Sequence, residues 1–198
     1  MNDEPDYNLL YETAESQAGY FTAAQARTHG FSWERLSDNV KRGRFLRIVR
    51  GVYRLAHFPG SAHEDLFVAW LRTGPHSVIS HESALTLYNL SDVLPGEIHV
   101  IIPRTASRRR PGLRLHTNQL RPEDVTNRQG LPVTTVARTI ADVAIAGLAK
   151  EQIAQAITEA LSRGLTTVEE LVTQAVYQGG RARETIQEAL SEDFSHEI

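Results

Sequence analysis

The first thirty residues have the apolar spacing of two short amphipathic helices. Apolar positions recur with a helical period over residues 8–18, and Gly19 ends that run. Thr22 and Gln25 then stand three residues apart, which is the spacing of a capping box at the start of a helix. The pattern therefore predicts one helix over 8–18 and a second helix from this box to Thr28.

A third helix and a β-hairpin are expected next. Ser32 is placed as the N-cap of the helix, and Gly43 as its C-terminal stop. The predicted apolar face of this helix consists of Trp33, Leu36 and Val40. Two β-rich runs, 45–49 and 52–55, then flank Gly51, which can take the positive φ of a tight turn. This order of elements predicts a winged helix-turn-helix, whose third helix lies in the major groove of DNA.

The remaining chain has the mixed pattern of an α+β domain. Helices are expected to begin near Ser61 and at Ser80, each capped by that serine. Strands are expected over 97–102 and 112–117. Further helices are marked by apolar positions within 136–144, 153–161 and 171–176, and Thr167 with Glu170 forms a capping box before the last of these. Gly179 and Gly180 are expected to break that helix before a terminal stretch over 181–190.

The fold class predicted from this pattern is α+β. We expect an N-terminal winged helix-turn-helix over residues 1–58, followed by a mixed α+β C-terminal domain with several terminal helices over residues 59–198. A chain of 198 residues that is 41% hydrophobic is long and apolar enough to form such cores.

Charge is distributed unevenly along the chain. The 21 Lys and Arg against 24 Asp and Glu give a net charge of −3. Residues 20–60, however, carry eight basic residues against two acidic ones, and residues 104–138 carry eight arginines against two acidic residues. Basic segments of this kind are candidate surfaces for a polyanion such as DNA.

The predicted winged helix places most of the first basic segment where DNA contacts are made. On the third helix, a step of roughly 100° per residue turns polar side chains away from the apolar face, where they could bond to base edges. Arginines on the hairpin would hold phosphates and fix the register. The candidate DNA-binding residues are Ser32, Arg35, Ser37, Asp38, Lys41, Arg42, Arg44, Arg47, Arg50 and Arg54.

A second basic patch surrounds the connection between the two predicted strands of the C-terminal domain. Its members are Arg104, Arg108, Arg109, Arg110 and Arg114. This patch could extend the DNA footprint or meet an anionic face or the RNA of a partner, and it could equally be a solvated loop. Both interpretations stay open.

Residue types used in catalysis are present, but their spacing does not suit the chemistry. Ser80, His81 and Glu82 are adjacent, so on a helix they point about 100° apart and cannot hydrogen-bond in series. The eight histidines show no metal-ligand spacing, which favours a chance distribution over the surface. No strand pairs a carboxylate with a following lysine, and no phosphate-binding glycine loop occurs. We therefore expect no enzyme, no cofactor and no metal site.

Two further expectations follow from composition and spacing. Arg138 and Asp142 stand four residues apart and are expected to form an ordinary helix pair worth a few tenths of a kcal/mol. The chain has no cysteine and no apolar run long enough to cross a membrane, and its first residues are acidic where a signal peptide would be basic. These features predict a cytoplasmic protein without a membrane partner.

Several stretches together resemble a known family. Residues 19–26, 36–43 and 50–53 are similar to the N-terminal winged-helix domain of AbiEi-type antitoxins, the transcriptional regulators of type IV (abortive infection) toxin–antitoxin modules. Residues 80–85 and 97–103 resemble the start of that family's C-terminal domain, and residues 131–142 resemble a later part of it.

The resemblance implies two activities. The winged domain would bind double-stranded operator DNA upstream of the protein's own gene and repress the promoter shared with a nucleotidyltransferase-like toxin. The C-terminal domain would neutralise that toxin without requiring a stable complex. Inverted-repeat operators would favour a homodimer on the DNA. Two alternatives remain: a protein-interaction module that does not bind DNA, and an unrecognised enzyme that modifies the toxin.

Overall fold

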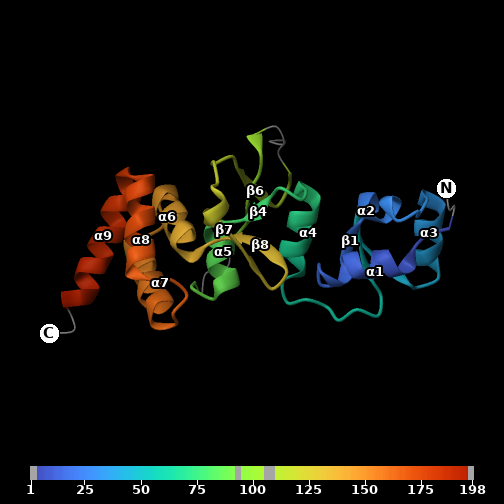
Figure 1. Ribbon diagram of the computed structural model, residues 1–198, viewed down its shortest axis with the longest axis horizontal. Coiled ribbons are helices and arrows are strands. Elements are labelled where there is room, and N and C mark those ends of the chain that lie inside the picture. Colours follow the sequence, from blue (N-terminus) through green and yellow to red (C-terminus); the bar gives the residue numbers. More distant parts are fainter. Residues whose placement is uncertain (1–3, 92–94, 105–109, 196–198) are drawn as a thin grey trace. The chain divides into compact units, whose positions relative to one another are not determined.

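The computed structural model describes residues 4–91, 95–104 and 110–195, and the chain divides into two compact units (Figure 1). The N-terminal unit takes in the residues up to His76 together with 129–131, and the C-terminal unit takes in the others. The sequence predicted a boundary after residue 58. The helix that follows this position packs on the N-terminal sheet, so it groups with the first unit instead.

The N-terminal unit has the element order of a winged helix. Its elements are α1 (Tyr7–Glu15), β1 (Tyr20–Thr22), α2 (Ala23–Thr28), α3 (Trp33–Lys41), β2 (Phe45–Val49), β3 (Val52–Leu55) and α4 (Glu64–Thr73). The three strands form an antiparallel sheet in the order β1-β3-β2, in which Tyr20 pairs with Arg54 and Phe45 pairs with Leu55. The sequence analysis did not predict β1, which is only three residues long.

Local capping and glycine geometry explain where these elements begin and end. The capping box of Thr22 and Gln25 is present as predicted, and Ser32 accepts a hydrogen bond from the Arg35 amide at the start of α3. Gly19 follows α1 at φ 85°, and a Cβ there would lie 2.5 Å from the Phe58 ring. Only glycine therefore fits at this bend.

The core of the N-terminal unit joins its helices to its sheet. The buried apolar residues are Leu10, Ala14, Phe21, Ala23, Ala26, Phe31, Leu36, Phe45 and Tyr53. Phe21 packs edge-on against Phe45 with ring centroids 5.0 Å apart and stacks on Tyr53 at 5.7 Å. Aromatic rings bury large apolar areas, so this cluster fixes α3 and the β2–β3 hairpin on one rigid support.

The C-terminal unit is a mixed α+β domain. Its first part contains β4 (Val78–Ile79), α5 (His81–Tyr88), β5 (Ile98–Ile101), β6 (Leu113–His116), the 3-10 helix η2 (Pro122–Asp124), β7 (Val125–Arg128) and β8 (Leu131–Thr134). Its second part contains α6 (Val136–Ala146), α7 (Lys150–Ser162), α8 (Val168–Gln178) and α9 (Gly180–Ser195). The five strands form one sheet in the order β6-β5-β4-β8-β7, in which β5 and β6 run parallel.

Helix α6 is the centre of the helical part of this unit, drawn in orange and red in Figure 1. It contacts α5, α7, α8 and α9, and every one of its residues from Val136 to Ala144 is buried. A helix that is buried on all sides needs apolar or paired side chains around its full circumference. Among the described residues, no helix has the length and apolar character needed to cross a membrane.

Two predicted helix caps, one in each unit, are wrong. Ser61 does not cap α4: the helix begins after His63, which makes no side-chain cap, and the Ser61 hydroxyl accepts from the His63 amide instead. Ser80 likewise makes no cap hydrogen bond, because its hydroxyl lies 3.0 Å from His81 Nδ1. The capping box of Thr167 and Glu170 is present as predicted.

Candidate nucleic-acid interface

Helix α3 is held in the N-terminal unit by its buried face, which leaves its polar face exposed. Leu36 is 1% exposed, and the buried Asn39 donates from Nδ2 to the Arg35 carbonyl at 2.8 Å and to Tyr7 Oη at 3.1 Å. A buried amide with both bonds satisfied fixes the rotation of α3 against α1. The sequence analysis did not single out Asn39, because a lone asparagine in a polar run carries no spacing signal.

Trp33 does not lie on the apolar face where it was predicted. Its side chain is 59% exposed, and the Arg27 guanidinium lies 5.7 Å from its ring centroid. The exposed aromatic ring at the start of α3 therefore lies beside a cation of α2. The error has a simple cause: Trp33 lies one turn before Leu36 and follows the N-cap directly, where the helix begins to leave the core.

The hairpin forms an exposed basic arm. Its register shifts between Arg47 and Val49, a bulge that twists the strand locally. At the tip, Gly51 has φ 84° and its carbonyl accepts from the Ala23 amide at 2.9 Å. The exposed arginines of the arm are Arg44, Arg47 and Arg50.

The structure exposes eight of the ten candidate DNA-binding residues and leaves Arg35 and Arg54 partly buried. The exposed ones are Ser32, Ser37, Asp38, Lys41, Arg42, Arg44, Arg47 and Arg50. Arg35 is half-buried. Arg54 is directed inward: its side chain is 17% exposed, and its guanidinium lies 4.0 Å from Glu64 and 5.8 Å from the Tyr20 ring centroid. Because this arginine is held by a carboxylate and a ring inside its own unit, we leave it out of the proposed DNA surface.

The second basic patch is described only in part. Arg104 and Arg114 are exposed and Arg110 is half-buried, whereas Arg108 and Arg109 lie outside the described residues. Arg114 lies on β6 and pairs in register with His99 of β5.

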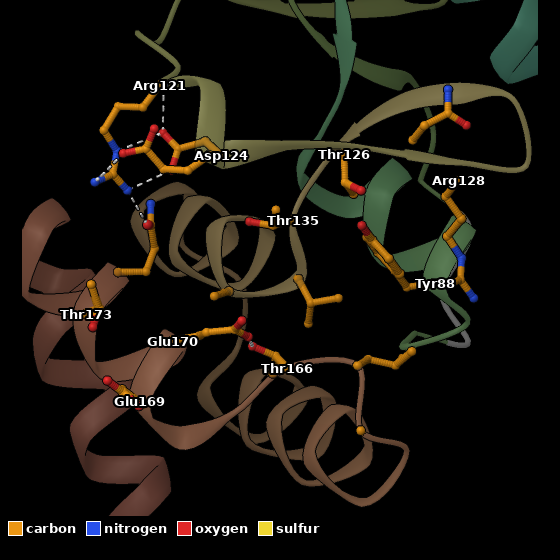
Figure 2. Close-up of a pocket in the computed structure, with 17 residues that line it drawn as sticks. Tyr88, Arg121, Asp124, Thr126, Arg128, Thr135, Thr166, Glu169, Glu170 and Thr173 are labelled. Atoms are coloured by element: carbon orange, nitrogen blue, oxygen red, sulfur yellow. Dashed lines mark hydrogen bonds and ion pairs between the residues drawn. The ribbon is translucent and has the colours of Figure 1, made fainter.

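A pocket of about 690 Å³ lies within the C-terminal unit and is lined by residues of α5, η2, β7, α6 and α8 (Figure 2). Arg121 donates to Asp124 from Nε at 3.3 Å and from Nη2 at 2.8 Å, and also to Gln174 at 2.8 Å. Its guanidinium lies 3.8 Å from the Tyr177 ring centroid. Arg121 therefore joins η2 to α8 through the side-chain carbonyl oxygen of Gln174, whereas Gln174 Nε2 is buried without a partner among the described residues. The sequence analysis missed Arg121 and Asp124.

Arg138 and Asp142 form the predicted i,i+4 pair on α6, but the pair is buried and belongs to a larger network that the sequence did not predict. Arg138 is 1% exposed and donates from Nε to both oxygens of Asp142 at 3.0 Å. Its Nη1 donates to Asp124 at 2.9 Å and to the Gln119 carbonyl at 3.2 Å. Burial raises the pKa of Asp142 to about 6 against the attraction of Arg138. For Asp124, burial acts in the same sense, but the bonds from Arg121 outweigh it and lower the pKa.

The prediction of a chance surface distribution is wrong for three of the eight histidines. His81, His99 and His116 come together in the C-terminal unit, and His81 and His99 are only 3% and 4% exposed. Burial lowers the pKa of His81 to about 2 and that of His99 and His116 to about 4. All three imidazoles are therefore neutral at pH 7.

Acidification is expected to destabilise the C-terminal unit through these histidines. Between a pH of about 6.5 and about 4, the unfolded chain binds a proton at His99 that the folded chain does not bind. The folded state then loses up to ~1.4 kcal/mol per pH unit for each such histidine. The urea concentration at the midpoint of unfolding should be lower at pH 5 than at pH 7. A chelator is present in both measurements so that no metal ion binds the histidines. Asp142 acts in the opposite sense, because its pKa is raised.

A variant of one buried histidine separates the effect of the histidines on the pH dependence of stability from the opposite effect of Asp142. His99→Gln should weaken the fall in midpoint between pH 7 and pH 5, whereas His57→Gln, at an exposed position, should leave it as in the wild type. Equal pH dependence in wild type and His99→Gln would show that the buried imidazole does not control it.

The structure defines a class of protein in which a winged helix with an exposed basic face is joined to a mixed α+β unit. Comparison with family profiles agrees with this class. The profile described as "Transcriptional regulator, AbiEi antitoxin" matches residues 8–56, and that of the "AbiEi antitoxin C-terminal domain" matches residues 77–191. The chain belongs to the AbiEi antitoxin family. No curated protein matches it.

Proposed function

We propose that this chain is an autorepressing antitoxin. It binds double-stranded operator DNA upstream of its own gene through the winged helix, and it neutralises a nucleotidyltransferase-like toxin through the C-terminal unit. The observation that supports binding to operator DNA is the exposed polar and basic surface of α3 and the hairpin, which one aromatic core holds in place. The match to an antitoxin C-terminal domain supports the neutralisation of a toxin.

The proposed mechanism has two steps. Arg44, Arg47 and Arg50 attract the duplex and hold phosphates, which fixes the position of the hairpin without reading sequence. The exposed side chains of α3 then contact base edges in the major groove, where arginine and lysine pair with guanine and carboxylates accept from cytosine. Two chains on an inverted repeat would match the two-fold symmetry of such an operator. The proposal assigns no catalytic step to the chain.

Changes on the exposed face of α3 are expected to alter sequence preference. Ser37, Asp38 and Lys41 are exposed, and Lys41 Nζ lies 3.7 Å from Asp38, an exposed pair that contributes little to stability. Replacing one of them with alanine should cost ~1–3 kcal/mol on operator DNA for each base that is no longer read, with little change on random DNA. Competition binding on operator and scrambled duplexes measures this difference.

The matched control for these variants is Glu12→Ala, an exposed change on α1 outside the proposed surface. It should leave both affinities unchanged. If the α3 variants weaken binding to operator and scrambled DNA equally, α3 is not the helix that reads sequence.

A further inference from the structure

Three histidines from separate elements meet on one face of the C-terminal sheet. His81 is the first residue of α5, His99 lies on β5, and His116 ends β6. The His81 and His116 rings stack with centroids 3.7 Å apart, and His99 lies 5.6 Å from the first ring and 5.2 Å from the second. One candidate ligand nitrogen from each ring lies within 4.8 Å of the other two.

The backbone holds these rings in position. In the parallel pair of β5 and β6, His116 is opposite Ile101, two residues along the strand from His99, so both histidines project from the same face. The His99 amide donates to Ser83 Oγ at 2.9 Å, and its carbonyl accepts from the Ser80 amide at 3.1 Å. His81 has φ 51°, a left-handed conformation that is costly for a residue with a Cβ.

Two polar atoms of this cluster are buried without a partner. His99 Nδ1 and His116 Nε2 make no hydrogen bond to any described residue. Buried polar side-chain atoms in folded proteins nearly always have a partner, so each exception calls for a bound water or ion. Both atoms belong to neighbouring rings whose centroids lie 5.2 Å apart, so one bound ion could be a partner for both.

We propose that His81, His99 and His116 form a binding site for one divalent transition-metal ion, for which Zn²⁺ is the best match. Imidazole nitrogen is a preferred ligand of Zn²⁺, and three protein ligands with an open fourth position form a known class of zinc site. Zinc–nitrogen distances of ~2.0–2.1 Å place tetrahedral ligand nitrogens ~3.4 Å apart. Metal binding would draw the ligand nitrogens together by no more than ~1.4 Å and would turn His81 or His116 out of their parallel stack, because a ring nitrogen binds a metal in the plane of its ring.

The surrounding groups support a specific set of ligand atoms. His81 Nδ1 is bound to Ser80 Oγ, which leaves Nε2 as its ligand, and His99 Nε2 lies 3.8 Å from Glu82 Oε2, which leaves Nδ1. His116 ligates through Nε2. Metal-bound histidines commonly donate their other N–H to a hydroxyl, carbonyl or carboxylate, and Ser80 Oγ is such a partner for His81, whereas Glu82 would have to move closer to His99 to become one. Neutral imidazoles have no proton to displace on binding.

Nearby charges tune the affinity of the site. Arg114 and Arg138 oppose a cation, as their effect on the pKa of the histidines shows, whereas Glu97 acts on His99 in the favourable sense. Glu82, whose side chain is 36% exposed, can approach as a fourth ligand or as the partner of His99. A bound ion would join α5 to β6, the edge strand of the sheet, and so stabilise the folded unit by mass action.

The test uses the full chain without an affinity tag, stripped with a chelator and titrated with Zn²⁺ against a chromogenic competitor. We expect one ion per chain. His116→Ala should reduce the affinity at least ~100-fold, since losing even a partner of a ligand costs 10–100-fold. His57→Ala, a change at an exposed histidine of the N-terminal unit, should bind as the wild type does.

Three more measurements can contradict the proposal even if His116→Ala folds poorly. The wild-type chain loaded with Co²⁺ should show the visible absorption of a nitrogen-ligated, low-coordinate ion, and Zn²⁺ should raise its melting temperature. Glu82→Gln should weaken binding while leaving the circular dichroism spectrum unchanged. No stoichiometric Zn²⁺ binding by the wild type, or equal loss in His116→Ala and His57→Ala, would overturn the proposal.

Discussion

Replacing Arg138 with alanine is expected to destabilise the C-terminal unit by about 3–5 kcal/mol, which is the range for breaking a buried ion pair from one side. The guanidinium binds both oxygens of Asp142 and one oxygen of Asp124, and the side chains of these two aspartates are 0% and 1% exposed. Its removal leaves Asp142 buried without its cation. The loss is therefore far larger than the few tenths of a kcal/mol that an exposed helix pair supplies.

Chemical denaturation followed by two probes can localise this effect. Both tryptophans, Trp33 and Trp70, lie in the N-terminal unit, so fluorescence follows that unit, and circular dichroism follows the helices of the C-terminal unit as well. Arg138→Ala should lower the midpoint seen by circular dichroism and leave the fluorescence midpoint nearly unchanged. If only the C-terminal unit loses stability, the two units unfold at different denaturant concentrations, and the circular dichroism curve shows two transitions.

Two companion variants test the physical reason. Lys150→Ala removes an exposed cation that pairs with Glu188 and should cost no more than ~1 kcal/mol. Combining Arg138→Met with Asp142→Asn removes both charges of the pair and should restore part of the stability that Arg138→Ala removes. A cost for Arg138→Ala as small as that for Lys150→Ala would contradict the account of the buried network.

Replacing Arg47 and Arg50 with alanine together is expected to weaken DNA binding about 100-fold, on the basis of ~1.5 kcal/mol for each charge-assisted hydrogen bond to a phosphate that is removed. Both side chains are exposed on the hairpin, outside the α3 face that is proposed to read bases. The loss should be the same on operator and random DNA. The slope of log affinity against log salt should fall by ~0.9 for each phosphate contact, or about 1.8 for the pair.

A charge-matched control distinguishes phosphate contacts from a change in net charge. Arg181→Ala with Arg183→Ala also removes two exposed cations, but from α9 of the C-terminal unit. It should leave the salt slope unchanged. The proposed function predicts that, in cells carrying the proposed toxin, the hairpin variant derepresses the promoter yet still neutralises the toxin. An unchanged salt slope in the hairpin variant would show that this arm does not clamp phosphates.

The elements of the winged helix could be predicted from sequence because their signals are local. The capping box at Thr22, the N-cap at Ser32 and the glycine at position 51 each act within a few residues, and the structure has all three. Short strands gave weaker signals: β4 has two residues and its partners are β5 and β8, distant in sequence. Their existence depends on tertiary pairing, which periodicity does not report.

The features that were missed depend on contacts between distant segments. His81, His99 and His116 are separated by 17 residues or more, and no short motif contains them, so only the β5–β6 register and the start of α5 bring them together. Arg138 gave the signal of a helix pair, but its burial follows from the packing of α6 among four other helices. Trp33 was assigned to the core by periodicity alone, which cannot detect where a helix leaves its support.

The measurement that tests the central claim most directly is a binding titration of the purified full chain on the DNA upstream of its own gene. Scrambled DNA of equal length is titrated in parallel, and both duplexes are measured at two salt concentrations. The account predicts preferential binding to the upstream DNA that weakens steeply as salt rises. Binding no stronger than to the scrambled duplex would contradict it, and would leave the N-terminal unit as a protein-contact module.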